Sequence, residues 1–128
     1  MSWEVFIIDD DRTICLIHKY LLKLVHQKEP AIYTNALKAL ELITNKNEED
    51  KFLIYLDINM PEIDGWDFIK RLENFSNPTR FLVVIVTSSV DELDKKKAKK
   101  YELVKGYVEK PLTKSKLKYL SPFIKKIS

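Results

Sequence analysis

The sequence predicts an α/β protein with a five-stranded parallel sheet, doubly wound so that helices cover both faces. Short runs rich in β-branched and aromatic residues alternate with stretches of helical period along the whole chain. Three of these runs are continuously apolar, as expected of strands that are covered on both faces. A chain of 128 residues has room for one hydrophobic core, so we expect a single domain over residues 1–128.

Five runs are the expected strands. Residues 5–8, 52–56 and 81–86 are unbroken apolar stretches and are expected at the centre of the sheet. Residues 31–33 and 106–108 are shorter and have polar neighbours, which indicates strands at the two edges. The strict alternation of strand and helix predicts parallel strands joined by right-handed crossovers.

Apolar residues at three- and four-residue steps indicate four amphipathic helices. Their stripes are Ile14, Ile17, Leu21, Leu24 and Val25; Leu37, Leu40 and Ile43; Phe68, Ile69, Leu72 and Phe75; and Leu117, Leu120, Ile124 and Ile127. A further helix is expected over residues 91–101, where apolar residues are few and lysines are many. The last helix follows Thr113, a candidate N-cap residue.

Composition restricts the class of protein. The longest apolar runs are far shorter than the roughly 20 residues that a membrane-spanning helix requires, so no membrane association is expected. The start of the chain lacks the features of a secretory signal, and we expect a cytoplasmic protein. Cys15, the single cysteine, is expected to be a small buried residue. Residues 91–128 hold 12 lysines and 5 acids, so this third of the chain is basic.

Ionisable or hydroxylic residues follow four of the expected strands. They are Asp9 and Asp10, Asp57, Thr87, and Lys110. In doubly wound sheets the functional crevice lies outside the carboxyl ends of the strands, so these residues are expected to meet. Clustered carboxylates are tolerated beside a cation, and oxygen ligands favour Mg²⁺. A lysine and a hydroxyl beside Mg²⁺ suit phosphoryl transfer, with Asp57 as the nucleophile.

Each of these residues, taken alone, has a simpler explanation. Asp10 or Asp11 could cap the first helix, and Thr87 could initiate the fourth. Lys110, which precedes Pro111, could be an ordinary surface residue. Their joint occurrence at successive strand ends is the observation that favours a shared site.

The chain resembles the receiver domains of two-component response regulators over essentially its whole length. The motifs that carry the resemblance are Ile7-Ile8-Asp9-Asp10-Asp11, Leu56-Asp57-Ile58-Asn59-Met60-Pro61 with Asp64-Gly65, Val86-Thr87-Ser88, and Gly106-Tyr107-Val108-Glu109-Lys110-Pro111. The resemblance implies the flavodoxin-like strand order 2-1-3-4-5. It also implies a protein that catalyses only its own phosphorylation and dephosphorylation.

The resemblance assigns roles to individual residues. Asp57 would accept a phosphoryl group from a histidine kinase or a histidine phosphotransfer protein. Asp9 and Asp10 would help to hold Mg²⁺, together with Asp57 and the backbone carbonyl of Asn59. In addition, Lys110 would pair with Asp57 or the phosphoryl group, Thr87 would move to hydrogen-bond a phosphate oxygen, and Tyr107 would follow it inward as a switch residue. Permanent packing of Tyr107 on the core is the alternative.

Two other functions compete with this one. A haloacid-dehalogenase-type phosphohydrolase also uses a strand-end aspartate, but it needs a second acid where this chain has Asn59. A receiver that docks without taking phosphate has no need of the clustered carboxylates. Because no output domain follows Lys110, we expect a stand-alone receiver that signals through a downstream protein. Its expected surface is the lysine-rich face of the fourth helix, fifth strand and fifth helix, and nucleic acid is not expected there.

Overall fold

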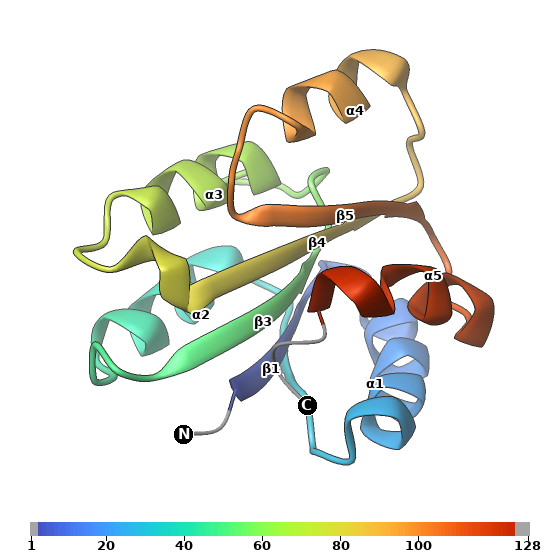
Figure 1. The fold of residues 1–128 in the computed structure, drawn as a ribbon, viewed down its shortest axis with the longest axis horizontal. Helices are drawn as coiled ribbons and strands as arrows, with labels where there is room; N and C mark the ends of the chain where they lie inside the picture. The colour runs from blue at the N-terminus through green and yellow to red at the C-terminus, as the bar shows by residue number, and fades with distance from the viewer. Residues whose placement is uncertain (1–2, 125–128) are drawn as a thin grey trace.

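The computed structural model describes residues 3–124, and within them five parallel strands form one sheet in the order β2-β1-β3-β4-β5 (Figure 1). The elements are β1 (Trp3–Ile8), α1 (Arg12–His26), β2 (Ala31–Tyr33), α2 (Ala36–Thr44), β3 (Lys51–Leu56), α3 (Gly65–Glu73), a 3₁₀ turn (Pro78–Arg80), β4 (Phe81–Thr87), α4 (Glu92–Ala98), β5 (Val104–Glu109) and α5 (Lys114–Ile124). The predicted fold class and strand order are therefore confirmed. A bilayer-spanning helix is absent from this part of the chain.

The helices form two layers, one on each face of the sheet. Figure 1 shows α1 and α5 on one side and α2, α3 and α4 on the other. Successive residues of a strand point to opposite faces, and β3 supplies both layers: Phe52 and Ile54 pack toward α2 and α3, while Leu53 and Tyr55 pack toward α1 and α5. Every residue of β4 is buried. The central strands thus form two hydrophobic cores.

Side-chain caps fix where the helices begin. The carboxylates of Asp11, Asp64 and Asp91 and the amide oxygen of Asn35 each accept a backbone N–H from the first turn of the following helix. At α5 the hydroxyl of Thr113 accepts from the N–H of Lys116 at 3.2 Å, as predicted. At α1 the cap is Asp11, which leaves the Asp10 carboxylate available for another role.

The face that α1 turns to the core differs from the predicted stripe. Its buried residues are Cys15, His18 and Leu22. Ile17, Leu24 and Val25, three members of the predicted stripe, are exposed. Because α1 carries apolar residues around most of its circumference, its apolar period fits more than one face. The stripe of α5 was predicted correctly for Leu117, Leu120 and Ile124, and Ile127 lies outside the described residues.

Two glycines allow close packing beside the strand ends. A Cβ atom on Gly65 would lie 2.6 Å from the Cα of Ile58 and 3.0 Å from the carbonyl oxygen of Asp57. A Cβ atom on Gly106 would lie 2.3 Å from Cδ2 of Leu120. Real Cβ atoms do not approach other atoms so closely. Glycine at these positions therefore lets α3 start directly beside Asp57 and lets α5 rest on β5.

Candidate functional site

The carboxyl ends of neighbouring strands bring the predicted residues together. β1, β3, β4 and β5 lie side by side and run in the same direction, so the residues that follow them gather at one edge of the sheet. The strand order reverses between β1 and its neighbours β2 and β3, which is where doubly wound sheets carry their sites. Asp9 and Asp57 directly follow β1 and β3 at this point.

Three carboxylates form an acidic cluster at this edge. One oxygen from each of Asp9, Asp10 and Asp57 lies within 4.8 Å of the other two. Asp9 is 3% exposed and Asp57 is 4% exposed, whereas Asp10 faces solvent. Oxygen donors at this spacing suit a hard divalent cation, and a partly buried site with one open side leaves room for waters and phosphate oxygens. The residues present therefore fit Mg²⁺.

Lys110 joins the two buried acids. Its ammonium nitrogen lies 2.7 Å from Oδ2 of Asp9 and 3.1 Å from Oδ2 of Asp57. Its own backbone N–H donates to the carbonyl of Thr87 at 2.9 Å, which holds the end of β5 against β4. Burial alone would lower the pKa of Lys110, but the hydrogen bond to Asp9 and the charges of Asp57 and Asp9 outweigh it and raise the pKa. Lys110 is therefore a permanent cation in the acidic cluster.

Asp9 shows the electrostatic strain of this cluster. Burial raises its pKa above the ordinary value, and the neighbouring charge of Asp57 acts in the same direction. The hydrogen bonds from Lys110 and from the backbone N–H of Asp11 oppose this rise and do not cancel it. A divalent cation would relieve the same repulsion, which is a second indication that the cluster is a cation site.

Asn59 connects Asp57 to Thr87. The hydroxyl of Thr87 is fully buried and accepts from the side-chain amide of Asn59 at 3.4 Å and from the N–H of Ser89 at 3.3 Å. The backbone N–H of Asn59 donates to Oδ1 of Asp57 at 3.2 Å. Both oxygens of Asp57 are thus engaged, one by Asn59 and the other by Lys110.

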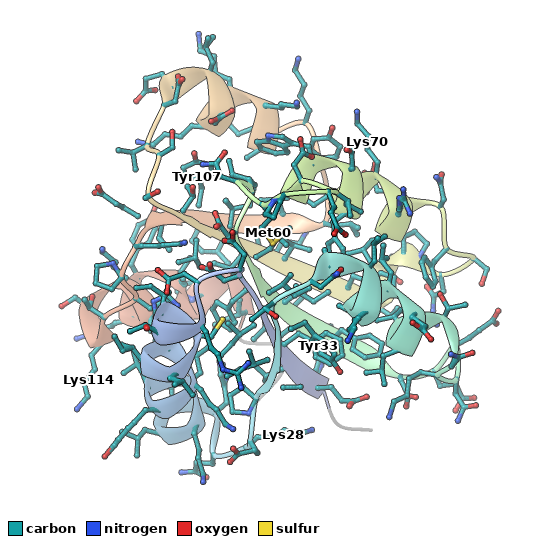
Figure 2. All side chains as sticks on the ribbon, turned by 180° about the vertical axis from the view of Figure 1, so that it is seen from behind. Lys28, Tyr33, Met60, Lys70, Tyr107 and Lys114 are labelled. Carbon is teal, nitrogen blue, oxygen red and sulfur yellow. The ribbon has the colours of Figure 1, made fainter. Side chains whose placement is uncertain are left out.

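Tyr107 is connected to the loop that follows Thr87. It is half-buried on the side of β5 that faces α4, and its hydroxyl donates to the carbonyl of Ser89 at 2.7 Å (Figure 2). Met60, also labelled in Figure 2, lies three residues after Asp57 and is partly buried against the core cluster that includes residues of α3. Because Tyr107 is hydrogen-bonded to Ser89, a movement of the segment from Thr87 to Ser89 would change the position of the Tyr107 side chain.

His18 and Cys15, which the sequence did not place near the site, both contact its supporting backbone. Nε2 of His18 accepts from the N–H of Leu112 at 2.9 Å, and the thiol of Cys15 donates to the carbonyl of Asp9 at 3.2 Å. Burial, with smaller effects from nearby lysines, lowers the pKa of His18 to about 4, and burial raises the pKa of Cys15 to about 11. Both side chains are therefore neutral near pH 7. The only signal in the sequence is the helical spacing that they share with Leu22.

The geometry defines a flavodoxin-like α/β domain with an acidic cluster and a lysine at its strand ends. Residues 5–120 match the family described as the response regulator receiver domain. The chain is 32% identical over 116 residues to the two-component response regulator ARR22 of Arabidopsis thaliana, a match that covers 89% of this chain and 78% of that protein. The chain belongs to the response regulator receiver domain family of two-component signalling.

Two further comparisons define the extent of the similarity. The crystal structure of a two-component response regulator from Cytophaga hutchinsonii matches with a TM-score of 0.83 and 27% identity, over 98% of this chain and 99% of that chain. The transcriptional regulatory protein ZraR of Klebsiella oxytoca is 32% identical over 88 residues, which are 69% of this chain and 19% of that regulator. The matched stretch is thus about a fifth of that regulator.

Proposed function

We propose that the protein accepts a phosphoryl group on Asp57 from the phosphohistidine of a histidine kinase or a histidine phosphotransfer protein, in a Mg²⁺-dependent reaction. The observation that carries this proposal is the position of the Lys110 ammonium between Asp57 and Asp9, beside an acidic cluster that is open on the side of Asp10. Such a site neutralises charge on phosphate oxygens, which is the main requirement of phosphoryl transfer.

The proposed Mg²⁺ ligands are the carboxylates of Asp9, Asp10 and Asp57 and the backbone carbonyl of Asn59. The cation, when bound, neutralises charge on the phosphoryl oxygens and on the clustered acids. The contact of the Asn59 backbone N–H with Oδ1 of Asp57 supports this set, because it holds the two residues together at the end of β3. Asp9 is fixed in turn by the N–H of Asp11 at 2.9 Å.

The transfer is a displacement at phosphorus. A carboxylate oxygen of Asp57 attacks the phosphorus atom, the bond from phosphorus to the donor imidazole nitrogen breaks, and that nitrogen keeps the electron pair. The donor leaves as a neutral imidazole, whose single N–H proton is already on its other ring nitrogen or comes from solvent. The product is an acyl phosphate on Asp57. Lys110 leaves the Asp57 oxygen and pairs with a phosphoryl oxygen. Dephosphorylation is a separate reaction, in which water attacks the phosphorus atom and loses a proton to solvent. The bond from phosphorus to the Asp57 oxygen breaks, which releases inorganic phosphate and restores the Asp57 carboxylate.

Thr87 and Tyr107 are the proposed switch residues. A phosphoryl group on Asp57 offers a new acceptor to the buried hydroxyl of Thr87, which now accepts from Asn59 and Ser89. Turning of Thr87 toward the phosphoryl group would shift the backbone of Ser89 and disturb its hydrogen bond with Tyr107. Phosphorylation would then favour a second conformation, and a partner that binds the two conformations with different affinities would read the signal.

The proposed output surface is the face formed by α4, β5 and α5, and the proposed partner is a protein with an acidic surface there. A hollow of about 520 Å³ lies on this face, with Tyr107, Tyr119 and Phe123 among its lining residues. Lys96 of α4 and Lys99, the C-cap residue of that helix, also line it. Apolar rings beside lysines suit a protein partner better than nucleic acid, which offers mainly phosphates to such a surface.

The test of the phosphoacceptor uses intact-mass measurement after incubation with acetyl phosphate and Mg²⁺. We expect one added phosphoryl group, which is absent in Asp57→Asn and absent when a chelator removes Mg²⁺. The matched control is Asp67→Asn, an exposed aspartate on α3 outside the cluster, which should retain the adduct. An adduct that persists in Asp57→Asn would contradict the assignment of the nucleophile. No adduct in the unaltered protein would favour a receiver that docks without phosphorylation.

The same phosphorylated sample tests the output surface. Hydrogen-deuterium exchange should change in the segment from Ser88 to Asp91 and in β5, because Thr87 and Tyr107 connect the phosphoryl group to both. Exchange in the backbone of α2 should be unchanged and serves as the internal control, because α2 contacts β2, at the opposite edge of the sheet from β5. If exchange changes only around Asp57, the face of α4, β5 and α5 is not the output surface.

A further inference from the structure

The segment that carries Lys110 is held from both sides by side chains of two helices. The N–H of Leu112, two residues beyond Lys110, donates to Nε2 of His18 on α1 at 2.9 Å. The ammonium of Lys116 on α5 donates to the carbonyl of Glu109 at 2.7 Å and to that of Pro111 at 3.0 Å. Lys110 lies between these anchors, so their positions determine where its backbone sits.

The contact from His18 is the buried one of the two. His18 is 2% exposed and Leu112 is 4% exposed, so water does not compete for the hydrogen bond. A buried backbone N–H strongly requires a partner, and the position of Leu112 is therefore tied to that of the imidazole ring. The ring is neutral near pH 7, because burial lowers its pKa to about 4, and Nε2 keeps the lone pair that accepts this bond.

The same helix is fixed to the acidic cluster. α1 begins at Arg12, its N-cap is Asp11, and the thiol of Cys15 donates to the carbonyl of Asp9. His18 follows Cys15 by one helical turn on the same buried face. One rigid element thus contacts both the backbone of the acids and the backbone of the segment that carries the lysine.

We propose that His18 is a positioning residue, through which α1 fixes Leu112 and thereby places the Lys110 ammonium between Asp9 and Asp57 for phosphoryl transfer. This inference rests on the proposed function. Loss of the contact leaves all ligand carboxylates in place and loosens only the lysine. Displacement of a reacting or neutralising group by about 1 Å is enough to slow an enzyme-type step severely, so the effect should appear in the rate of phosphorylation.

The experiment compares two amides at position 18. In His18→Gln the amide oxygen falls near the position of Nε2 and can still accept from Leu112, whereas in His18→Asn it falls short. We expect His18→Asn to phosphorylate about tenfold more slowly with acetyl phosphate at saturating Mg²⁺, and His18→Gln to remain within about twofold of the unaltered protein. Circular dichroism checks that each variant is folded. If His18→Asn is unfolded, His18→Ala replaces it with the same expected loss.

Two readouts separate positioning from general damage. The Mg²⁺ dissociation constant of His18→Asn should not rise, because a looser Lys110 competes less with the cation, whereas a disrupted acidic cluster would bind Mg²⁺ more weakly. In a Lys110→Ala background, His18→Asn should have no further effect on the rate. The inference is overturned by equal rates in His18→Asn and the unaltered protein, by weaker Mg²⁺ binding, or by an equal loss without Lys110. Failure of the unaltered protein to take a phosphoryl group would instead contradict the proposed function.

Discussion

At the scale of single residues, Asp10 and Asp11 show how two adjacent acids in one loop take different roles. The Asp10 carboxylate belongs to the cluster with Asp9 and Asp57. The Asp11 carboxylate instead accepts the N–H groups of Thr13 and Ile14 at 3.0 and 3.2 Å. Both side chains are exposed, so their surroundings and not their burial distinguish them. The pair therefore offers a matched comparison for metal binding.

We predict that Asp10→Asn weakens Mg²⁺ binding by at least about tenfold, because the substitution removes one of the proposed carboxylate ligands. Asp11→Asn removes the same charge one residue away and should change the dissociation constant by less than about twofold, since asparagine caps a helix as well as aspartate does. Isothermal titration calorimetry at 0.15 M salt, where charges separated by more than about 8 Å are largely screened, measures both values. Equal weakening in the two variants would show that only the local charge matters.

The residues that meet in the candidate site could be selected from the sequence, because each lies at or directly beyond the end of a strand. Asp57, Thr87 and Lys110 could be found by this position alone, and the structure brings Lys110 within hydrogen-bond distance of Asp57. The sequence could not predict the contact from His18, because its partner is a backbone N–H 94 residues further along the chain. A backbone group has no residue type to recognise, so contacts of this kind become visible only when the fold is known.

At the scale of elements, strands were predicted better than the faces of helices. A run such as residues 81–86 is apolar throughout, and no decision about its buried side is needed in a strand covered on both faces. For α1 such a decision was needed, and the predicted stripe was wrong at three of its five positions: Ile17, for example, is 51% exposed, whereas the neighbouring His18 is 2% exposed. The hydrophobic period alone does not determine how a helix with apolar residues on several sides rests on a sheet.

The edge strand β5 was predicted too short for a related reason. It extends from Val104 to Glu109, so it begins two residues before the predicted run of 106–108 and ends one residue after it. The exposed side chains of Lys105 and Glu109 interrupt the apolar pattern by which a strand is recognised. β5 pairs only with β4 within the described sheet, so it tolerates polar residues that a central strand would not. The register of the pairing between β4 and β5 also shifts between Val83 and Val84, and no pattern of residues in the sequence predicts this irregularity.

At the scale of the whole molecule, the free energy of unfolding depends on pH through buried titratable groups. The histidines and Asp9 change it in opposite directions. The pKa of His18 and that of His26 are lowered by burial, so the unfolded chain binds protons at these residues more readily than the folded chain. Their stabilising contribution is present above the unfolded value of 6.5 and is lost as the pH falls. The raised pKa of Asp9 acts in the opposite direction, since there the folded chain binds the proton more readily.

The contribution of His18 can be isolated with His18→Gln, which keeps a hydrogen-bond acceptor and cannot be protonated. With a pKa of about 4 in the folded chain and 6.5 in the unfolded chain, His18 should lower the free energy of unfolding by about 2 kcal/mol between pH 7 and pH 5. Urea unfolding at the two pH values should therefore show a loss that is larger by this amount in the unaltered protein than in His18→Gln. His26 and Asp9 titrate in both proteins and cancel in the comparison. An identical pH dependence in the two proteins would mean that His18 takes up a proton as readily in the folded chain as in the unfolded chain. Because a protonated ring has no lone pair to accept the N–H of Leu112, this result would contradict the hydrogen bond between His18 and Leu112.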